Sequence, residues 1–146
     1  MSFTSEEIAY LQSQHLARLA TVGPDGQPDA VPVGFEFDGT RFYIGGHNPE
    51  NTRKFRNVAA GHTKVALVID DLVSTDPWTP RFVRVYGTAE LISRAGRFDS
   101  ARYLEITPHV SWSWNLAGQP FGPGNAGSFA PRRTVHTSQS PSPAVL

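Results

Sequence analysis

The sequence contains no cysteine, which excludes disulfide bridges, thiolate nucleophiles and zinc–thiolate centres. It also lacks an excess of charge of either sign, because thirteen Lys and Arg residues balance thirteen Asp and Glu residues. Non-specific nucleic-acid binding needs a net basic face, so this balance argues against a nucleic-acid partner. No apolar run approaches the roughly 20 residues of a membrane span, and no signal-peptide pattern is visible. We therefore expect a cytoplasmic protein with no membrane partner.

Motifs of several enzyme classes are missing too. The five histidines show no i, i+4 pair and no carboxylate at ligand spacing, so we predict no metal site. Gly122–Gly127 fits the GxGxxG pattern of dinucleotide binding, but no strand precedes it and no helix follows it, so we reject that interpretation. No catalytic triad is visible, and we assign no catalytic residue. These absences agree with a protein whose cofactor carries the chemistry.

The chain does have strand patterns along most of its 146 residues, a length that suits one domain. Apolar segments separated by Gly, Pro and Asp turns predict strands at 16–22, 30–37, 41–45, 64–70 and 82–92. The segment 64–70 is nearly all apolar, which is typical of a strand buried on both faces. We predict a small split antiparallel β-barrel, mainly β, of about six strands with two or three short helices.

Two helices have start signals. Thr4 and Glu7 form a capping box before the first apolar face. Asn48 as N-cap and Pro49 at the first helical position predict a second helix that Gly61 ends. A third, weaker helix is expected at 97–104.

The composition divides the chain into residues 1–116, the barrel domain, and residues 117–146, an arm. The last thirty residues hold five prolines, four glycines and four serines, and no acidic side chain follows Glu105. Such a segment buries little apolar surface, so we interpret it as an extended or disordered arm that could order against a partner subunit.

The most informative stretch is 45–54, where a predicted strand meets two glycines and then a helix carrying Thr52, Arg53 and Lys54. Arg53 can offer a bidentate fork and Lys54 a point charge, while Thr52 can donate from its hydroxyl, which suits a phosphate. The alternative is an ordinary solvated helix face. His47, beside this stretch, could bind phosphate or be a surface histidine.

These residues also carry a family resemblance. Thr52–Lys54, followed about ten residues later by the buried strand, resembles the cofactor-phosphate motif of the pyridoxamine phosphate oxidase-like split-barrel family. Further segments are similar to the actinobacterial branch of that family that uses the deazaflavin coenzyme F420, and within it to the group containing a tetracycline-biosynthesis reductase. These segments are 3–19, 23–28, 31–35, 68–72 and 76–78.

The resemblance implies roles for particular residues. The cofactor ring would lie along Val31, Pro32 and Val33, in the predicted strand that Pro32 and Gly34 interrupt, and the phosphate would lie at Thr52–Lys54. The ribityl chain would lie beside Tyr43, Ile44 and Gly45. Two further residues near the cofactor would be supplied across a dimer interface, Trp78 and Trp114. Without the resemblance, Pro32 reads as an edge-strand residue and each Trp as a core or interface aromatic.

The implied protein is a homodimeric F420-dependent oxidoreductase that transfers hydride to an unsaturated small molecule. FMN is the alternative cofactor, and a non-catalytic cofactor-binding protein or a plain interaction protein are the alternative functions. One departure stands out: the branch tends to carry basic residues before the Ser-Trp of its last strand, and here His109 and Val110 take those positions.

Overall fold

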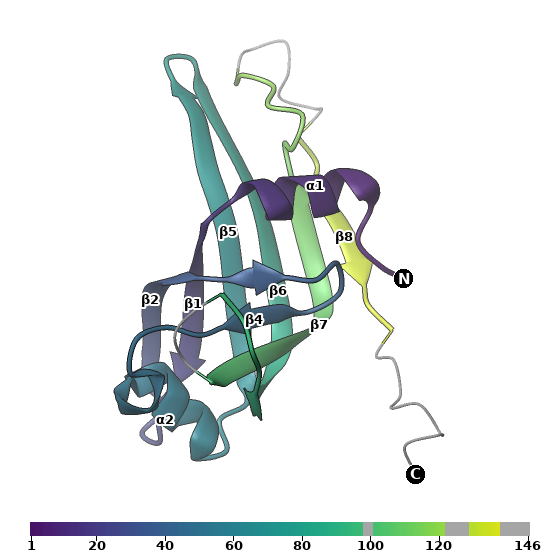
Figure 1. Ribbon diagram of the computed structural model, residues 1–146. Helices are drawn as coiled ribbons and strands as arrows, with labels where there is room; N and C mark the ends of the chain where they lie inside the picture. The colour runs from purple at the N-terminus through teal and green to yellow at the C-terminus, as the bar shows by residue number, and fades with distance from the viewer. Residues whose placement is uncertain (98–100, 122–128, 138–146) are drawn as a thin grey trace, which may run out of the picture.

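The computed structural model describes residues 1–97, 101–121 and 129–137, and its strands form one curled antiparallel sheet (Figure 1). The strand order is β2-β1-β5-β6-β7-β4-β3, with β8 added beside β7. The bounds are β1 Leu16–Val22, β2 Pro28–Gly34, β3 Glu36–Phe37, β4 Phe42–Ile44, β5 Lys64–Thr75, β6 Trp78–Ser93, β7 Arg102–Trp114 and β8 Arg132–Val135. The predicted split barrel is confirmed, with eight strands in place of about six.

The extra strands have identifiable origins. The segment predicted as one strand at 30–37 is two strands, because β2 pairs with β1 while β3 pairs with β4. Phe35 lies between them with its side chain in the core, so the chain changes partners at that bend. The expected interruption at Pro32 is wrong, since the β1–β2 register runs unbroken from Leu16↔Gly34 to Val22↔Pro28. β2 is an edge strand, where a proline is tolerated because a missing N–H can face away from the ladder.

The sheet buries one face. In β5, Val65, Leu67 and Ile69 are buried in the core, while Ala66 and Val68 between them are half-buried on the opposite face. The expectation that this strand is buried on both faces is therefore wrong for a single chain. Its outer face remains partly open to solvent although its side chains are apolar.

The first helix, α1 (Ser5–Ser13), has the predicted capping box. The Glu7 backbone N–H donates to the Thr4 hydroxyl across 3.1 Å, and the Thr4 N–H donates to the Glu7 carboxylate across 2.9 Å. Glu7 is buried and also forms an ion pair of 3.2 Å with Arg132 of β8. This pair joins the start of the chain to the arm.

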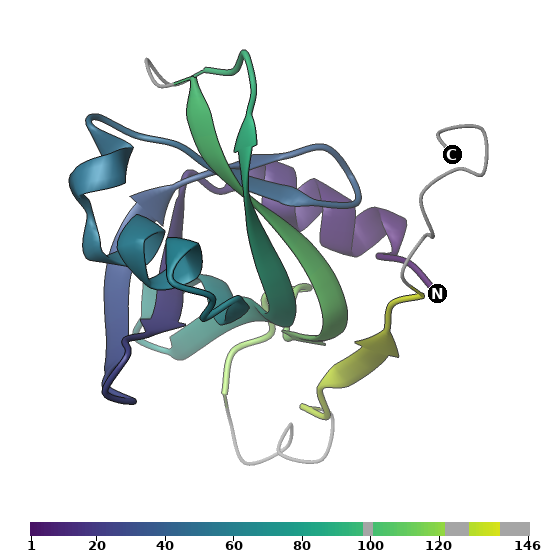
Figure 2. The same ribbon diagram turned by 90° about the horizontal axis from the view of Figure 1, so that it is seen from below.

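The second predicted helix consists of two pieces. A 3₁₀ turn, η1 (Pro49–Asn51), precedes α2 (Arg53–Ala59), and Thr52 between them has extended backbone angles. The Thr52 hydroxyl donates to the Pro49 carbonyl, a local bond that competes with continuous helix. α2 packs on β1 and β6 and contributes Phe55 and Val58 to the same core as α1, at another end of the curled sheet (Figure 1, Figure 2).

The remaining predictions concern the second half of the chain. The helix expected at 97–104 is wrong in its described part, because β7 begins at Arg102 and extends the β6 ladder. In the arm, β8 pairs with β7, while the GxGxxG segment at 122–127 lies outside the described residues. No helix within the described ranges has the length and apolar character needed to cross a membrane.

Candidate cofactor site

The open edge of β2 is the first component of the site. β1 is its only ladder partner among the described strands, so the backbone groups of its other edge are free to bind a ligand. Val33 is buried and Val31 packs against the core, whereas Pro32 is exposed. A ring lying along this strand would therefore contact Val31 and Val33 through their backbone and Pro32 through its side chain.

The predicted ribityl-side residues are buried. Ile44 is fully enclosed in the core, and Gly45 after it is buried too. The Tyr43 hydroxyl donates to the Asp38 carboxylate across 2.8 Å, and the Arg94 guanidinium lies 3.8 Å from the Tyr43 ring centroid. Burial and this bond to Asp38 raise the pKa of Tyr43 to about 12. These side chains are occupied within the fold, and the Tyr43 position is paired on both sides, with Glu36 of β3 and Glu105 of β7.

A sharp turn connects β4 to the cationic residues. His47 at this turn is exposed, and Asn48 beside it adopts a left-handed backbone with φ 52°. Thr52, whose hydroxyl already donates to Pro49, would offer a ligand its acceptor lone pair or exchange that bond.

Lys54 and Arg53 point to different sides of α2, because neighbouring helical residues are about 100° apart. Lys54 is half-buried on the side of β2, where burial lowers the pKa of its ammonium and the nearby Asp29 carboxylate partly opposes that effect. Arg53 is exposed and lines a cavity between α2 and the β1–β2 turn. The two cations that were predicted to bind one phosphate therefore point in different directions. Lys54 lies toward β2, the strand that contains Pro32, and Arg53 lies toward the β1–β2 turn.

A buried hydrogen bond positions α2. The Asn57 side-chain amide donates to the Thr21 hydroxyl of β1 across 3.0 Å, and both residues are nearly inaccessible to solvent. The sequence prediction missed Asn57 and also Asp29. The signal for Asn57 was its position in the sequence. It lies three residues after Lys54, so on a helix the two side chains are neighbours.

The tip of the β5–β6 hairpin lies at the opposite end of the sheet from α2 (Figure 1), and the two predicted tryptophans lie at the start of β6 and the end of β7. Trp78 is 53% exposed at the tip of the β5–β6 hairpin, beside Thr75. Trp114, at the end of β7, stacks on Phe82 with 5.6 Å between ring centroids. At about 3.3 Å per residue, β5 alone separates the hairpin tip from the end near α2 by roughly 35 Å. One copy of the chain therefore does not bring Trp78 to the cations.

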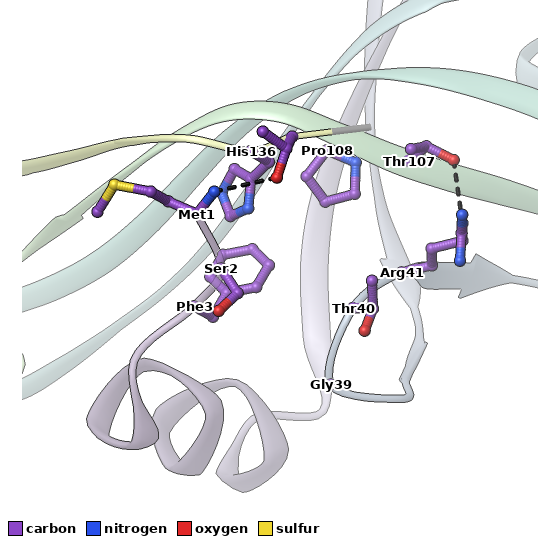
Figure 3. A pocket seen from close by; sticks show the side chains of 10 residues that line it. Met1, Ser2, Phe3, Gly39, Thr40, Arg41, Thr107, Pro108 and His136 are labelled. Atoms are coloured by element: carbon purple, nitrogen blue, oxygen red, sulfur yellow. Dashed lines mark hydrogen bonds between the residues drawn. The ribbon is translucent and has the colours of Figure 1, made fainter. Parts of the chain in front are cut away.

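A second cavity, of about 270 Å³, lies between the first residues, the β3–β4 turn and the end of β8 (Figure 3). Arg41 on its wall donates through Nε to the Thr107 hydroxyl across 3.3 Å, and the Phe3 ring packs 4.4 Å from the His136 ring. Burial, opposed by Glu7, lowers the pKa of His136. The cavity shares no lining residue with β2 or α2, so it is separate from the cofactor site.

Comparison with known proteins adds four findings. The profile described as pyridoxamine 5′-phosphate oxidase matches residues 3–133. The 5a,11a-dehydrotetracycline/5a,11a-dehydrooxytetracycline reductase of Streptomyces rimosus is 40% identical over 124 residues, 81% of this chain and 87% of the relative. A conserved hypothetical protein of Mycobacterium tuberculosis has a TM-score of 0.63 at 22% identity, over 82% of this chain and 91% of that one. An F420 reductase has a TM-score of 0.52 at 21% identity, over 67% and 89%. At these identities the two structures bear on the fold alone.

Proposed function

This chain belongs to the pyridoxamine 5′-phosphate oxidase family, as its motifs suggested, and we propose that it is an F420-dependent reductase of an unsaturated or conjugated small molecule. The relative from Streptomyces rimosus supports the reductase activity, since its name denotes reduction of dehydro compounds. The similarity of segments 31–35, 68–72 and 76–78 to the F420-using branch of the family supports the choice of cofactor.

The observation that carries the proposal is the half-buried ammonium of Lys54 beside the open edge of β2. Burial disfavours its charge, and Asp29 is the carboxylate that acts on it. A bound phosphate would offset that desolvation through a charge-assisted hydrogen bond. The β2 edge next to it offers free backbone groups to a planar, polar ring. The residues present therefore fit a ring joined to a phosphate.

When bound, a reduced deazaflavin supplies the hydride. The chain's own part is to bind and orient. Lys54 holds the phosphate, and the backbone of 31–33 fixes the ring against the exposed side chain of Pro32. The Tyr43 hydroxyl donates to Asp38 and the Ile44 side chain lies in the core, so neither of these two groups would contact the ligand.

We further propose that the site is completed by a second copy of the chain. The outer face of β5, β6 and β7 carries apolar side chains that one copy leaves uncovered, among them Val68, Tyr86 and Trp112. In a two-fold dimer the same face packs on itself. Packing with the strands reversed would carry Trp78 and Trp114 of one copy toward α2 of the other.

The test is a titration of the purified protein with F420, FMN and FAD, followed by fluorescence polarisation of the ligand. We expect F420 to bind most tightly and its reduced form to be oxidised when an enone or quinone substrate is added. Tighter binding of FMN than of F420 would favour the alternative in which the cofactor is a flavin. Tight binding without oxidation across a panel of such acceptors would favour a non-catalytic cofactor-binding protein, and no binding of any of the three would contradict the proposal.

A further inference from the structure

The cavity of about 270 Å³ beside the start of the chain has walls of two kinds (Figure 3). The rings of Phe3 and His136 lie on one side of it, and the side chains of Thr40 and Arg41 lie on the other. Pockets that hold small molecules span about 300–1,000 Å³, so this cavity has room for a ligand at the small end of that range.

Arg41 gives the cavity a positive charge. Its Nε donates to the Thr107 hydroxyl across 3.3 Å, while its two terminal amino groups form no hydrogen bond or ion pair with any residue that the structure describes. The residues that line the cavity include neither an aspartate nor a glutamate. The paired donors of this half-buried guanidinium therefore remain available to an anion.

Asp38, the carboxylate nearest to Arg41 in the sequence, is already engaged. It accepts hydrogen bonds of 2.9 and 2.7 Å from the backbone N–H groups of Thr40 and Arg41, and one of 2.8 Å from the Tyr43 hydroxyl. Burial would raise the pKa of Asp38, but these bonds outweigh burial and lower it, with a smaller effect from the charge of Arg41. The turn thus fixes the backbone of Arg41 and leaves its guanidinium to a ligand.

The wall across from Arg41 is largely apolar. Phe3 and Pro108 are buried, and the Phe3 ring centroid lies 4.4 Å from that of His136. The Ser111 hydroxyl is hydrogen-bonded to the His136 Nε2 across 2.8 Å, which holds the imidazole in place. Burial lowers the pKa of His136 against the opposing charge of Glu7, so the ring is uncharged at neutral pH. Such a wall suits a flat hydrocarbon group rather than a second charge.

We propose that this cavity is a second ligand site, which binds a small carboxylate with a flat apolar body. The carboxylate lies on the Arg41 guanidinium, and the body lies against Phe3 and Pro108. The inference does not depend on the proposed cofactor, because no residue of β2 or α2 lines the cavity.

The experiment is a titration of ¹⁵N-labelled protein with benzoate, in which amide chemical shifts report both the affinity and the place of binding. Three further ligands separate the parts of the proposal. Benzamide has the same ring without the charge, acetate has the carboxylate without the ring, and inorganic phosphate is an anion of another kind. Each is titrated into wild type, Arg41→Gln and Arg133→Gln. Arg133 is exposed on β8 and does not line the cavity, so its variant is the control for loss of one positive charge.

We expect benzoate to bind wild type with a dissociation constant of about 0.1–1 mM, as suits a ligand of this size. The largest shifts should fall on the amides of Gly39, Thr40 and Thr107. Benzamide, acetate and phosphate should each bind at least about fivefold more weakly than benzoate. Arg41→Gln should weaken benzoate binding about tenfold, and Arg133→Gln should leave it unchanged.

Several results would overturn the inference. Benzoate shifts centred on another part of the chain, or no benzoate binding, would show that the cavity is not the site. Equal binding of benzoate and benzamide to wild type would exclude Arg41 as the anchor, and this comparison holds even where Arg41→Gln does not fold. Acetate or phosphate binding as tight as that of benzoate would exclude the preference for a flat body. Equal losses in Arg41→Gln and Arg133→Gln would reduce the effect to net charge.

Discussion

The Asn57 side-chain amide and the Thr21 hydroxyl form a buried hydrogen bond of 3.0 Å that joins α2 to β1. This bond sets the orientation of the short helix that carries Lys54 on one side and Arg56 on another. The candidate cofactor site therefore depends on a contact between residues 36 positions apart.

Thr21→Val tests that contact. The variant keeps the shape of the side chain and leaves the Asn57 amide buried without its acceptor, so we expect the free energy of unfolding to fall by about 1–3 kcal/mol. Urea unfolding measures it. Thr75→Val, at an exposed strand position, is the control and should change stability by less than about 0.5 kcal/mol. A Thr21→Val protein as stable as wild type would show that the bond does not hold α2 in place.

The two lysines of the chain offer a matched test of the phosphate position. We expect Lys54→Ala to weaken cofactor binding by about 1.5–3 kcal/mol, since it removes a charge-assisted contact. Lys64→Ala removes the same charge from an exposed position at the start of β5 and should have little effect. Equal affinities for wild type and Lys54→Ala in a titration would mean that the phosphate lies elsewhere.

The lowered pKa of Lys54 predicts a pH dependence of binding. The charged ammonium binds the phosphate, and burial lowers the pKa at which that charge is lost. Cofactor affinity should therefore decline with rising pH earlier than an ordinary lysine would allow. In Lys54→Arg the guanidinium stays charged, so its affinity should remain flat over the same alkaline range. Parallel pH profiles for the two proteins would argue against Lys54 as the titrating contact.

Asp71 predicts an acid-sensitive contribution to stability. Its carboxylate accepts hydrogen bonds of 3.0 and 2.7 Å from Arg81 and one of 2.7 Å from the Tyr10 hydroxyl. The bonds from Arg81 are the largest cause that lowers its pKa, and that from Tyr10 adds to them, while burial opposes both. A lowered pKa in the folded state means stabilisation that is present above the unfolded value and lost as pH falls through the folded one.

We therefore expect Asp71→Asn to destabilise the protein by about 1–3 kcal/mol at neutral pH. The difference from wild type should shrink toward zero below about pH 3. Thermal unfolding across pH measures both, with the exposed Asp76→Asn as control. A difference that stays constant into acid would rule out the charged network as its source.

The shared site predicts complementation between two defective proteins. Lys54→Ala damages the α2 side and Trp78→Ala the hairpin side, so each homodimer should bind cofactor weakly. Mixing and re-equilibrating the subunits yields mixed dimers in which one of the two sites has both residues, so about a quarter of all sites should recover. If mixing restores no binding, the two residues do not belong to one site formed by two copies, and the dimer arrangement is wrong.

Prediction from the sequence was most accurate where the contacts that determine the structure are local. The capping box of Thr4 and Glu7 spans three residues, and the strand patterns repeat every second residue, so both could be predicted without knowing the fold. The predictions that were wrong concern partners. Pro32 does not break its strand because β2 is an edge strand, and residues 102–104 are strand because β6 lies beside them.

By itself the sequence determined the strands, the turns, the first helix and the cationic group at 52–54, because side-chain patterning and backbone preferences act over a few residues. Only the tertiary structure decided that Lys54 turns toward β2 and Arg53 toward the β1–β2 turn, and that Trp78 lies at the other end of the sheet. Those facts depend on which strands pair and on where α2 docks. Both are set by packing between segments far apart in the chain, which no local pattern encodes.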